Sequence, residues 1–271
     1  MEIVSRAREV LRLIFGMGLS QLIFLLLIPI LTRLFSPSDI GALGTYLTLV
    51  AVLVIFLTGR YEMALVFCKD QCLARAVERL SILRCYIFSI LIGIVVLAMF
   101  LLSPGAQDII LSSDLYFVIF GALILGRYNI ALQMVLRNSH YKSISIARVS
   151  HSIVFGVTAI CAALSLIPNM LMLFFSDAIA RLISWRTLEQ KNCRTTIPIS
   201  DIKNARARFA RFSNFEQLTA LFSILSIQSP MILIPLIFDA ATAGLYFIVF
   251  RVVMGPVGLV ANAVFDVFKV E

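Results

Sequence analysis

Charged side chains inside long apolar stretches are the residues with the clearest chemical potential. Arg127, Arg148, Asp177, Arg181 and Arg251 lie within such stretches or at their ends. A charge near the centre of a bilayer costs roughly 2.5–3.5 kcal/mol on insertion scales, so it must face protein or water. Because guanidinium groups match the geometry of phosphate oxygens, buried arginines predict an anionic ligand.

Two of these positions are the most informative. Asp177 and Arg181 are spaced to pair on one helix face, either as a structural salt bridge or as part of a binding site. Arg251 begins a polar or small stripe at helical spacing, which continues with Gly255, Gly258, Asn262 and Asp266. Such stripes often mean close helix packing. Together with a buried arginine, this one favours a water-filled cavity. Arg148 could reach the membrane surface, and the direction of Arg127 stays open.

The composition indicates whether the chain folds in water or in a membrane. Of the 271 residues, 61% are hydrophobic and only 14% are charged, and the mean hydropathy is +0.99. One soluble core could not bury so much apolar surface. We therefore expect an all-α polytopic membrane protein, which excludes a cytosolic enzyme, a nucleic-acid binder and a secreted disulfide domain.

The apolar runs predict about eight transmembrane helices, since a span needs about 20 residues. The expected spans are Leu13–Leu31, Ile40–Gly59, Cys85–Ser103, Leu115–Leu136, Val149–Pro168, Asn169–Trp185, Gln217–Phe238 and Ala240–Phe265.

Charge in the connecting segments predicts the orientation. With the N-terminus in the cytoplasm, most of the 23 basic residues fall inside. The outer loops then carry Arg33 and four acids, namely Asp39, Asp108, Asp114 and Asp239. This alternation follows the positive-inside rule and predicts that both termini are cytoplasmic.

A faint repeat suggests two lobes. Pro29, Gly44 and Tyr46 recur as Pro230, Gly244 and Tyr246 in a later pair of spans. Parallel repeats of this kind are a known transporter design. The predicted organisation is a six-helix lobe over residues 1–186, a basic cytoplasmic linker over 187–215, and the first two helices of a second lobe over 216–271. The amphipathic end of the linker predicts a helix on an anionic leaflet.

The sequence offers no sign of covalent chemistry. It has no nucleophile with a partnered base, no phosphate-binding loop and no metal-ligand cluster, so we expect no enzyme, no metal and no cofactor. The five cysteines are expected to be structural thiols.

Several runs resemble the Wzx-type O-antigen and polysaccharide flippases of the multidrug, oligosaccharidyl-lipid and polysaccharide exporter superfamily. They are Gln21–Pro37, with Thr32, Arg33 and Leu34; Gly59–Ala64, with Arg60, Tyr61 and Glu62; Leu136 and Arg137; and the later run with Pro230, Gly244, Leu245 and Arg251. The resemblance extends from about Val10 to Phe268. It departs from the family at Asp177 and Arg181, where small or apolar residues are usual.

The resemblance implies a flippase for undecaprenyl-pyrophosphate-linked oligosaccharide in the bacterial inner membrane, working by alternating access through a cationic cavity. It places Arg60 and Glu62 at the cytoplasmic mouth, Arg251 within the cavity and Arg33 near the periplasmic end. Asp177 and Arg181 complete the expected substrate-binding set. The expected partners are the lipid-linked substrate, membrane lipids and other polysaccharide assembly proteins, with no nucleic acid. Because the family has two six-helix lobes, we expect this chain to be C-terminally truncated.

Three alternatives remain at this level. A drug or cation antiporter of the same superfamily would need buried carboxylates, which are scarce here. A membrane enzyme of the same pathway, such as a polymerase, would be expected to have a large outer loop with arginines, and Pro104–Asp114 has none. The chain could also be a non-functional truncated fragment.

Overall fold

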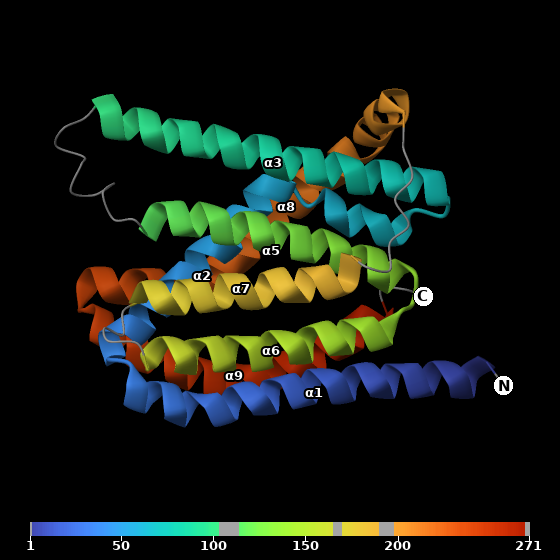
Figure 1. Ribbon diagram of the computed structural model, residues 1–271. Coiled ribbons are helices and arrows are strands. Elements are labelled where there is room, and N and C mark those ends of the chain that lie inside the picture. The colour runs from blue at the N-terminus through green and yellow to red at the C-terminus, as the bar shows by residue number, and fades with distance from the viewer. Residues whose placement is uncertain (1, 103–113, 165–169, 190–197, 269–271) are drawn as a thin grey trace. The chain divides into compact units, whose positions relative to one another are not determined.

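A computed structural model gives the arrangement of residues 2–102, 114–164, 170–189 and 198–268. These ranges are helical and contain no strand, which confirms the expected all-α class (Figure 1). The elements are α1 (Glu2–Leu34), α2 (Pro37–Thr58), the 3-10 helix η1 (Tyr61–Phe67), α3 (Gln71–Leu102), α5 (Asp114–Arg137), α6 (Tyr141–Ala163), α7 (Met170–Glu189), α8 (Ile199–Ile237) and α9 (Ala240–Phe268).

Many of these helices are suited to a bilayer. Six helices in the described ranges are long and apolar enough to cross a membrane, namely α1, α2, α3, α5, α6 and α8. The apolar part of α9 is shorter, Ala240–Gly255, and α7 is interrupted by the charges of Asp177, Arg181 and Arg186. The chain is therefore a multi-pass membrane protein.

The packing of the chain separates two compact units that interleave in sequence. The first unit contains residues 1–45, 131–194 and 230–271, and the second contains residues 46–130 and 195–229. Helices α2, α5 and α8 thus contribute to both. The predicted lobes, 1–186 and 216–271, divide the chain into consecutive segments and not into interleaved ones. They stay a prediction.

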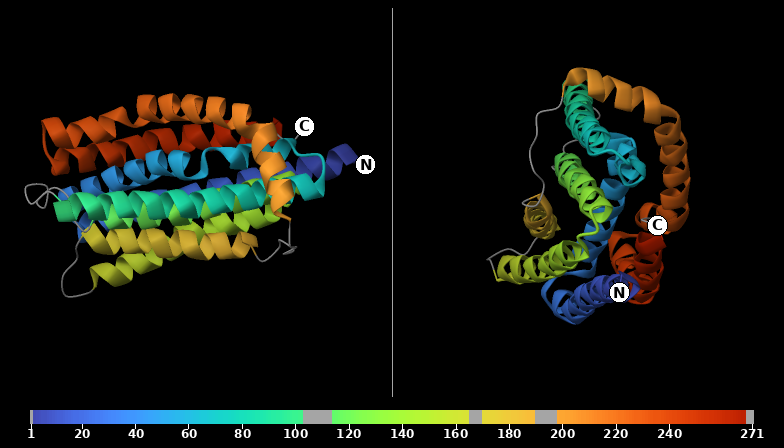
Figure 2. Two further views of the ribbon diagram at one scale, coloured as in Figure 1. Left: turned by 90° about the horizontal axis from the view of Figure 1, so that it is seen from above. Right: turned by 90° about the vertical axis from the view of Figure 1, so that its right-hand side faces the viewer.

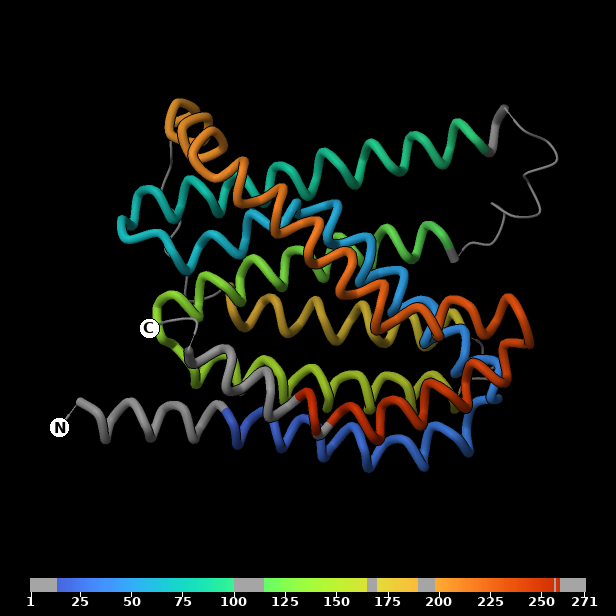
Figure 3. The backbone as a smooth tube through the Cα atoms, turned by 180° about the vertical axis from the view of Figure 1, so that it is seen from behind, coloured from blue at the N-terminus to red at the C-terminus, as the bar shows by residue number. Residues whose placement is uncertain are grey.

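In the first unit, α1 packs against both α6 and α9, and α7 packs against α6 on the side away from α1 (Figures 1 and 3). The Ser20 hydroxyl donates to the Arg148 carbonyl oxygen at 3.0 Å and is hydrogen-bonded to the Ser152 hydroxyl at 2.7 Å. These bonds join α1 to α6 without a charge, which suits an apolar surrounding.

The two segments of the predicted repeat touch in this unit. A Cβ on Gly244 would lie 2.0 Å from the Pro37 carbonyl oxygen, and one on Gly41 would lie 1.9 Å from the Ala240 carbonyl oxygen. The first turns of α2 and α9 therefore cross backbone to backbone, and only glycine permits this approach.

The starts of α2 and α9 are capped by matching acids. Asp39 Oδ2 accepts from the Ser36 hydroxyl and amide, and Asp239 Oδ1 accepts from the Thr242 amide at 2.7 Å. Carboxylates at helix N-termini satisfy free N–H groups and oppose the helix dipole favourably. Both capped ends precede a Gly-x-Tyr sequence, which extends the predicted repeat.

A proline lies inside α8 at the point where the chain passes from the second unit to the first. Pro230 has no N–H, so the Ser226 carbonyl loses its usual helical donor. The Ser229 hydroxyl donates to that carbonyl at 3.3 Å instead. The helix therefore continues through the proline with this acceptor satisfied.

In the second unit, α2 and α3 are joined by a left-handed turn and η1. Gly59 has φ 59° and Arg60 has φ 60°. Glycine adopts this conformation freely, whereas a residue with a Cβ pays a steric cost of roughly 1–2 kcal/mol. The surroundings of Arg60 must therefore hold it there.

Candidate functional site

Arg251 lies on α9 in the first unit with its guanidinium group between two aromatic rings. The guanidinium carbon lies 5.2 Å from the ring centre of Phe24 on α1 and 5.3 Å from that of Phe247 on α9. Ring faces attract cations, and the attraction grows when water is excluded. At a rise of about 1.5 Å per residue, Arg251 lies roughly 16 Å along α9 from Ala240, a distance of roughly half the thickness of a hydrocarbon layer of about 30 Å.

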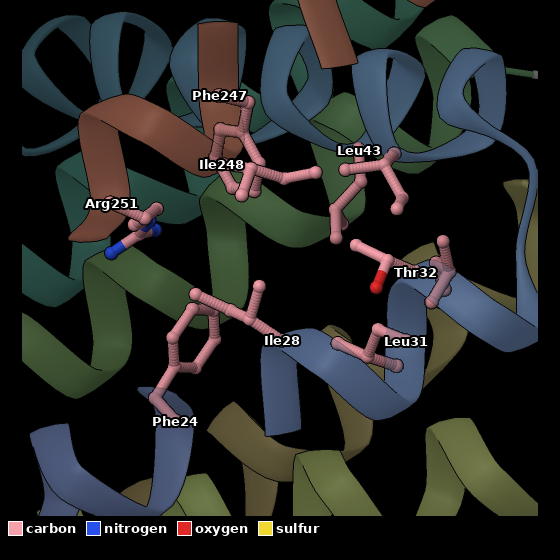
Figure 4. Close-up of a pocket in the computed structure, with 10 residues that line it drawn as sticks. Phe24, Ile28, Leu31, Thr32, Leu43, Phe247, Ile248 and Arg251 are labelled. Atoms are coloured by element: carbon pink, nitrogen blue, oxygen red, sulfur yellow. The ribbon is translucent and has the colours of Figure 1, made fainter. Parts of the chain in front are cut away.

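A pocket extends from Arg251 between α1, α2, α7 and α9 (Figure 4). Its walls are apolar, apart from Arg251 at one end and Thr32, whose hydroxyl also donates to the Pro29 carbonyl at 3.1 Å. The other lining residues are Phe24, Ile28, Leu31, Ile40, Leu43, Leu173, Phe247 and Ile248. Among the described residues, no acid lines this pocket, and the full charge that they contribute to it is positive.

Asp177 on α7 is enclosed by two basic side chains. Its Oδ2 accepts from Arg181 Nε at 2.6 Å, and its Oδ1 lies 3.6 Å from His151 Nε2 on α6. Asp177 is only 3% exposed. The predicted pairing of Asp177 with Arg181 is thus present, with His151 as a third member that the sequence analysis did not include.

This enclosure leaves Arg251 in a different situation from Arg181. Among the described residues, no carboxylate lies within ion-pair distance of Arg251. A series of ring contacts connects the two groups, because Phe24 stacks on Phe155 at 5.9 Å and Phe155 lies parallel to His151 at 6.5 Å. The arrangement can therefore hold an anion at Arg251, while Asp177 is engaged by Arg181 and His151.

Arg60 and Glu62 lie together in the second unit. Arg60 lies 3.8 Å from Glu62 and 3.6 Å from Glu216 on α8. Glu62 is 1% exposed and also accepts from the Thr58 hydroxyl at 3.1 Å. Two carboxylates thus compensate the charge of Arg60, and its predicted role in substrate binding stays a prediction.

One face of α8 packs against the left-handed turn and holds it. Ser213 donates to the Gly59 carbonyl oxygen, and Phe212 meets the ring of Phe67 at 5.7 Å. Gln217 accepts from Arg84 at 3.5 Å. A Cβ on Gly59 would meet the Arg84 guanidinium group, so a side chain there would displace the flexible end of Arg84 and would also be strained at this positive φ.

The other predicted charges lie elsewhere. Arg33 is exposed near the end of α1. Arg127 lies over the ring of Tyr86 in the second unit, at 5.7 Å, which settles the direction that the sequence left open. In the stripe that follows Arg251, Gly255 packs against the Gln21 amide of α1, so this position is a packing contact. The side chains of Asn262 and Asp266 lie outside the described residues.

The sequence analysis missed His151 and Phe24 as members of the site. His151 did carry a signal, because a histidine within an apolar span is a candidate partner for an intramembrane acid. Phe24 carried none, since phenylalanine is common in such spans. In the described part of the chain, no group of three or more potential ligands could hold a metal ion.

Comparison with known proteins identifies a family. The family model described as "polysaccharide biosynthesis protein" matches residues 30–269. No curated protein and no solved structure matches the chain.

Proposed function

The chain belongs to the polysaccharide biosynthesis protein family, and from that membership we propose that it translocates undecaprenyl-pyrophosphate-linked oligosaccharide, such as an O-antigen repeat unit. A role in polysaccharide synthesis or transport follows from the family. The flipping step and the lipid-linked substrate are the proposal.

The observation that carries the proposal is the setting of Arg251. It is a cation at one end of an apolar pocket, held by Phe24 and Phe247. Asp177, which could neutralise it, is already engaged by Arg181 and His151. A diphosphate carries negative charge that cannot cross hydrocarbon unaided, and an arginine fork supplies the donors that replace its water.

The proposed mechanism needs no covalent step. The diphosphate lies at Arg251, the sugars occupy a hydrated lumen, and the lipid tail stays in the bilayer. Rocking of helix bundles around this fixed site moves the headgroup between the two faces. No bond of the substrate is made or broken, so we propose a transporter and no enzyme.

We place the protein in the bacterial inner membrane with its N-terminus in the cytoplasm. The excess of basic residues in alternate connecting segments supports this orientation. Its proposed partners are the lipid-linked oligosaccharide, membrane lipids and other polysaccharide assembly proteins.

The test compares substrate binding and translocation in proteoliposomes that contain the 271-residue chain. A polyprenyl-diphosphate oligosaccharide with a fluorescent sugar serves as the substrate, and a quencher that cannot cross the membrane reports the exposed fraction. We expect Arg251→Ala to weaken binding at least tenfold, since losing a charge-assisted contact costs about 2–5 kcal/mol. Arg79→Ala, which removes an exposed charge from α3, is the matched control. Wild-type binding and flux in Arg251→Ala would refute the proposal.

A further inference from the structure

The first turns of α8 carry a basic surface with no role in the proposed transport. Lys203, Arg206, Arg208 and Arg211 are all exposed. We call them the basic face of α8. Asp201 is the only acid between Ile199 and Arg211. The segment therefore has a clear positive charge.

The opposite side of the same turns is packed in the second unit. Ala205 and Ser213 are fully buried. Ser213 donates to the Gly59 carbonyl oxygen, and Phe212 packs on Phe67. These contacts fix the rotation of the helix about its axis. The basic face is consequently presented outward by the fold.

One stripe on the exposed side changes from basic to apolar. Residues at alternating three- and four-residue steps lie on one helix face. Such steps connect Arg208, Arg211, Phe215, Leu218 and Phe222. The three apolar members are 72%, 57% and 70% exposed. The change occurs within one turn, between Arg211 and Phe215.

The length of α8 explains this change. The helix has 39 residues, which at about 1.5 Å per residue is roughly 58 Å, nearly twice a hydrocarbon layer of about 30 Å. Part of the helix must therefore lie outside the hydrocarbon, and the basic residues single out the early turns as that part. In Figure 2 the light-orange start of α8 runs across the direction of the part that follows it.

We propose that the basic face of α8 binds the headgroups of anionic phospholipids, with Phe215, Leu218 and Phe222 in the adjoining acyl-chain region. Basic clusters directly next to a membrane span are attracted to anionic leaflets, by roughly fivefold for each residue. An acidic soluble protein would match the arginines but would leave the three exposed apolar side chains in water. The continuous stripe therefore favours lipid, and this inference is independent of the transported substrate.

The experiment measures lipid selectivity by electron spin resonance. The full chain is reconstituted in phosphatidylcholine vesicles with spin-labelled phosphatidylglycerol or spin-labelled phosphatidylcholine, and the motionally restricted fraction of each label is compared. We expect the chain to select phosphatidylglycerol. The variant Lys203→Gln, Arg206→Gln, Arg208→Gln, Arg211→Gln should lose at least fivefold of that selectivity.

A matched variant removes the same number of exposed charges from other parts of the chain. It combines Lys69→Gln, Arg79→Gln, Lys142→Gln and Arg186→Gln, all exposed in the structure. It should keep the selectivity. Equal losses in the two variants, or full selectivity in the first, would overturn the proposal.

Two measurements keep the proposal testable if the fourfold variant fails to fold. Selectivity of the unmodified chain should fall between 0.1 M and 1 M salt, because the screening length falls from about 10 Å to about 3 Å. A Phe215→Trp variant in a Trp185→Phe chain should be quenched by lipids brominated on the acyl chain near the headgroup. Selectivity that is insensitive to salt, or a tryptophan that is not quenched, would refute the assignment.

Discussion

Arg181 donates its Nε to Asp177 Oδ2 at 2.6 Å, one helical turn away on α7. This contact and the neighbouring His151 together engage the carboxylate of Asp177 in the first unit. Arg181 and Arg251 therefore have different surroundings. Arg181 compensates a buried acid, whereas Arg251 has no carboxylate within ion-pair distance among the described residues.

The Asp177–Arg181 pair should be costly to break from one side. We expect Asp177→Ala to lower the free energy of unfolding by about 3–5 kcal/mol, because Arg181 then loses its carboxylate in a buried setting. Denaturant titration in mixed micelles measures the loss. The double change Asp177→Ala, Arg181→Leu should recover most of it, and additive losses in the double variant would contradict a coupled pair.

The crossing of α2 and α9 should not tolerate a side chain. In Gly244→Ala the new Cβ would lie 2.0 Å from the Pro37 carbonyl oxygen, so the helices must separate. We expect a loss of about 1–3 kcal/mol in unfolding free energy. Gly93→Ala is the control, since nothing lies within 4 Å of that Cβ. It should stabilise α3 by roughly 0.5–1 kcal/mol, and an equal loss in both variants would exclude the crossing as the cause.

Two substitutions of Arg60 can distinguish the loss of its charge from the effect of its strained, left-handed backbone. Arg60→Ala and Arg60→Gly both remove the contacts with Glu62 and Glu216, but only glycine adopts φ 60° without cost. Arg60→Gly should therefore be more stable than Arg60→Ala by about 1–2 kcal/mol in thermal or chemical unfolding. Equal stability would show that the turn changes its conformation once Arg60 is lost.

The cap of α9 should respond to acid. The side-chain hydrogen bond to Thr242 lowers the pKa of the Asp239 carboxyl below its usual value. A lowered pKa means that the contribution is complete above the unfolded value of about 3.9 and is lost as the pH falls through the lower folded value. Hydrogen exchange at the first turn of α9 should accelerate in that acidic range. In Asp239→Asn the amide cannot titrate, so this acceleration should be absent.

The membrane class and the Asp177–Arg181 pair could be predicted from the sequence because both depend on local patterns. The apolar composition indicates that the helices lie in a membrane, and a spacing of four residues brings two side chains together on any helix. The six strongest spans also follow from hydropathy alone.

The surroundings of Arg251 and Arg60 could not be predicted in the same way. Phe24, Phe247 and Glu216 meet these arginines through tertiary packing, and nothing in the spacing of an apolar span selects one phenylalanine over another. The stripe of polar or small residues after Arg251, which was expected to line a water-filled cavity, illustrates the same limit. Gly255 does lie on the predicted stripe, but the structure places the Gln21 amide against it.

The hydroxyl of Ser229 affects how α8 can bend in lipid. A proline normally leaves one carbonyl without a donor, and in hydrocarbon that loss costs several kcal/mol unless another group compensates. The Ser229 hydroxyl supplies this donor from within the same helix. Because Ser226 and Ser229 are three residues apart on α8, the hydrogen bond can be kept when the helix bends. Bending at Pro230 therefore needs neither a water molecule nor a neighbouring helix to satisfy the Ser226 carbonyl. Helix α8 can thus act as a hinge at the point where the chain passes from one unit to the other.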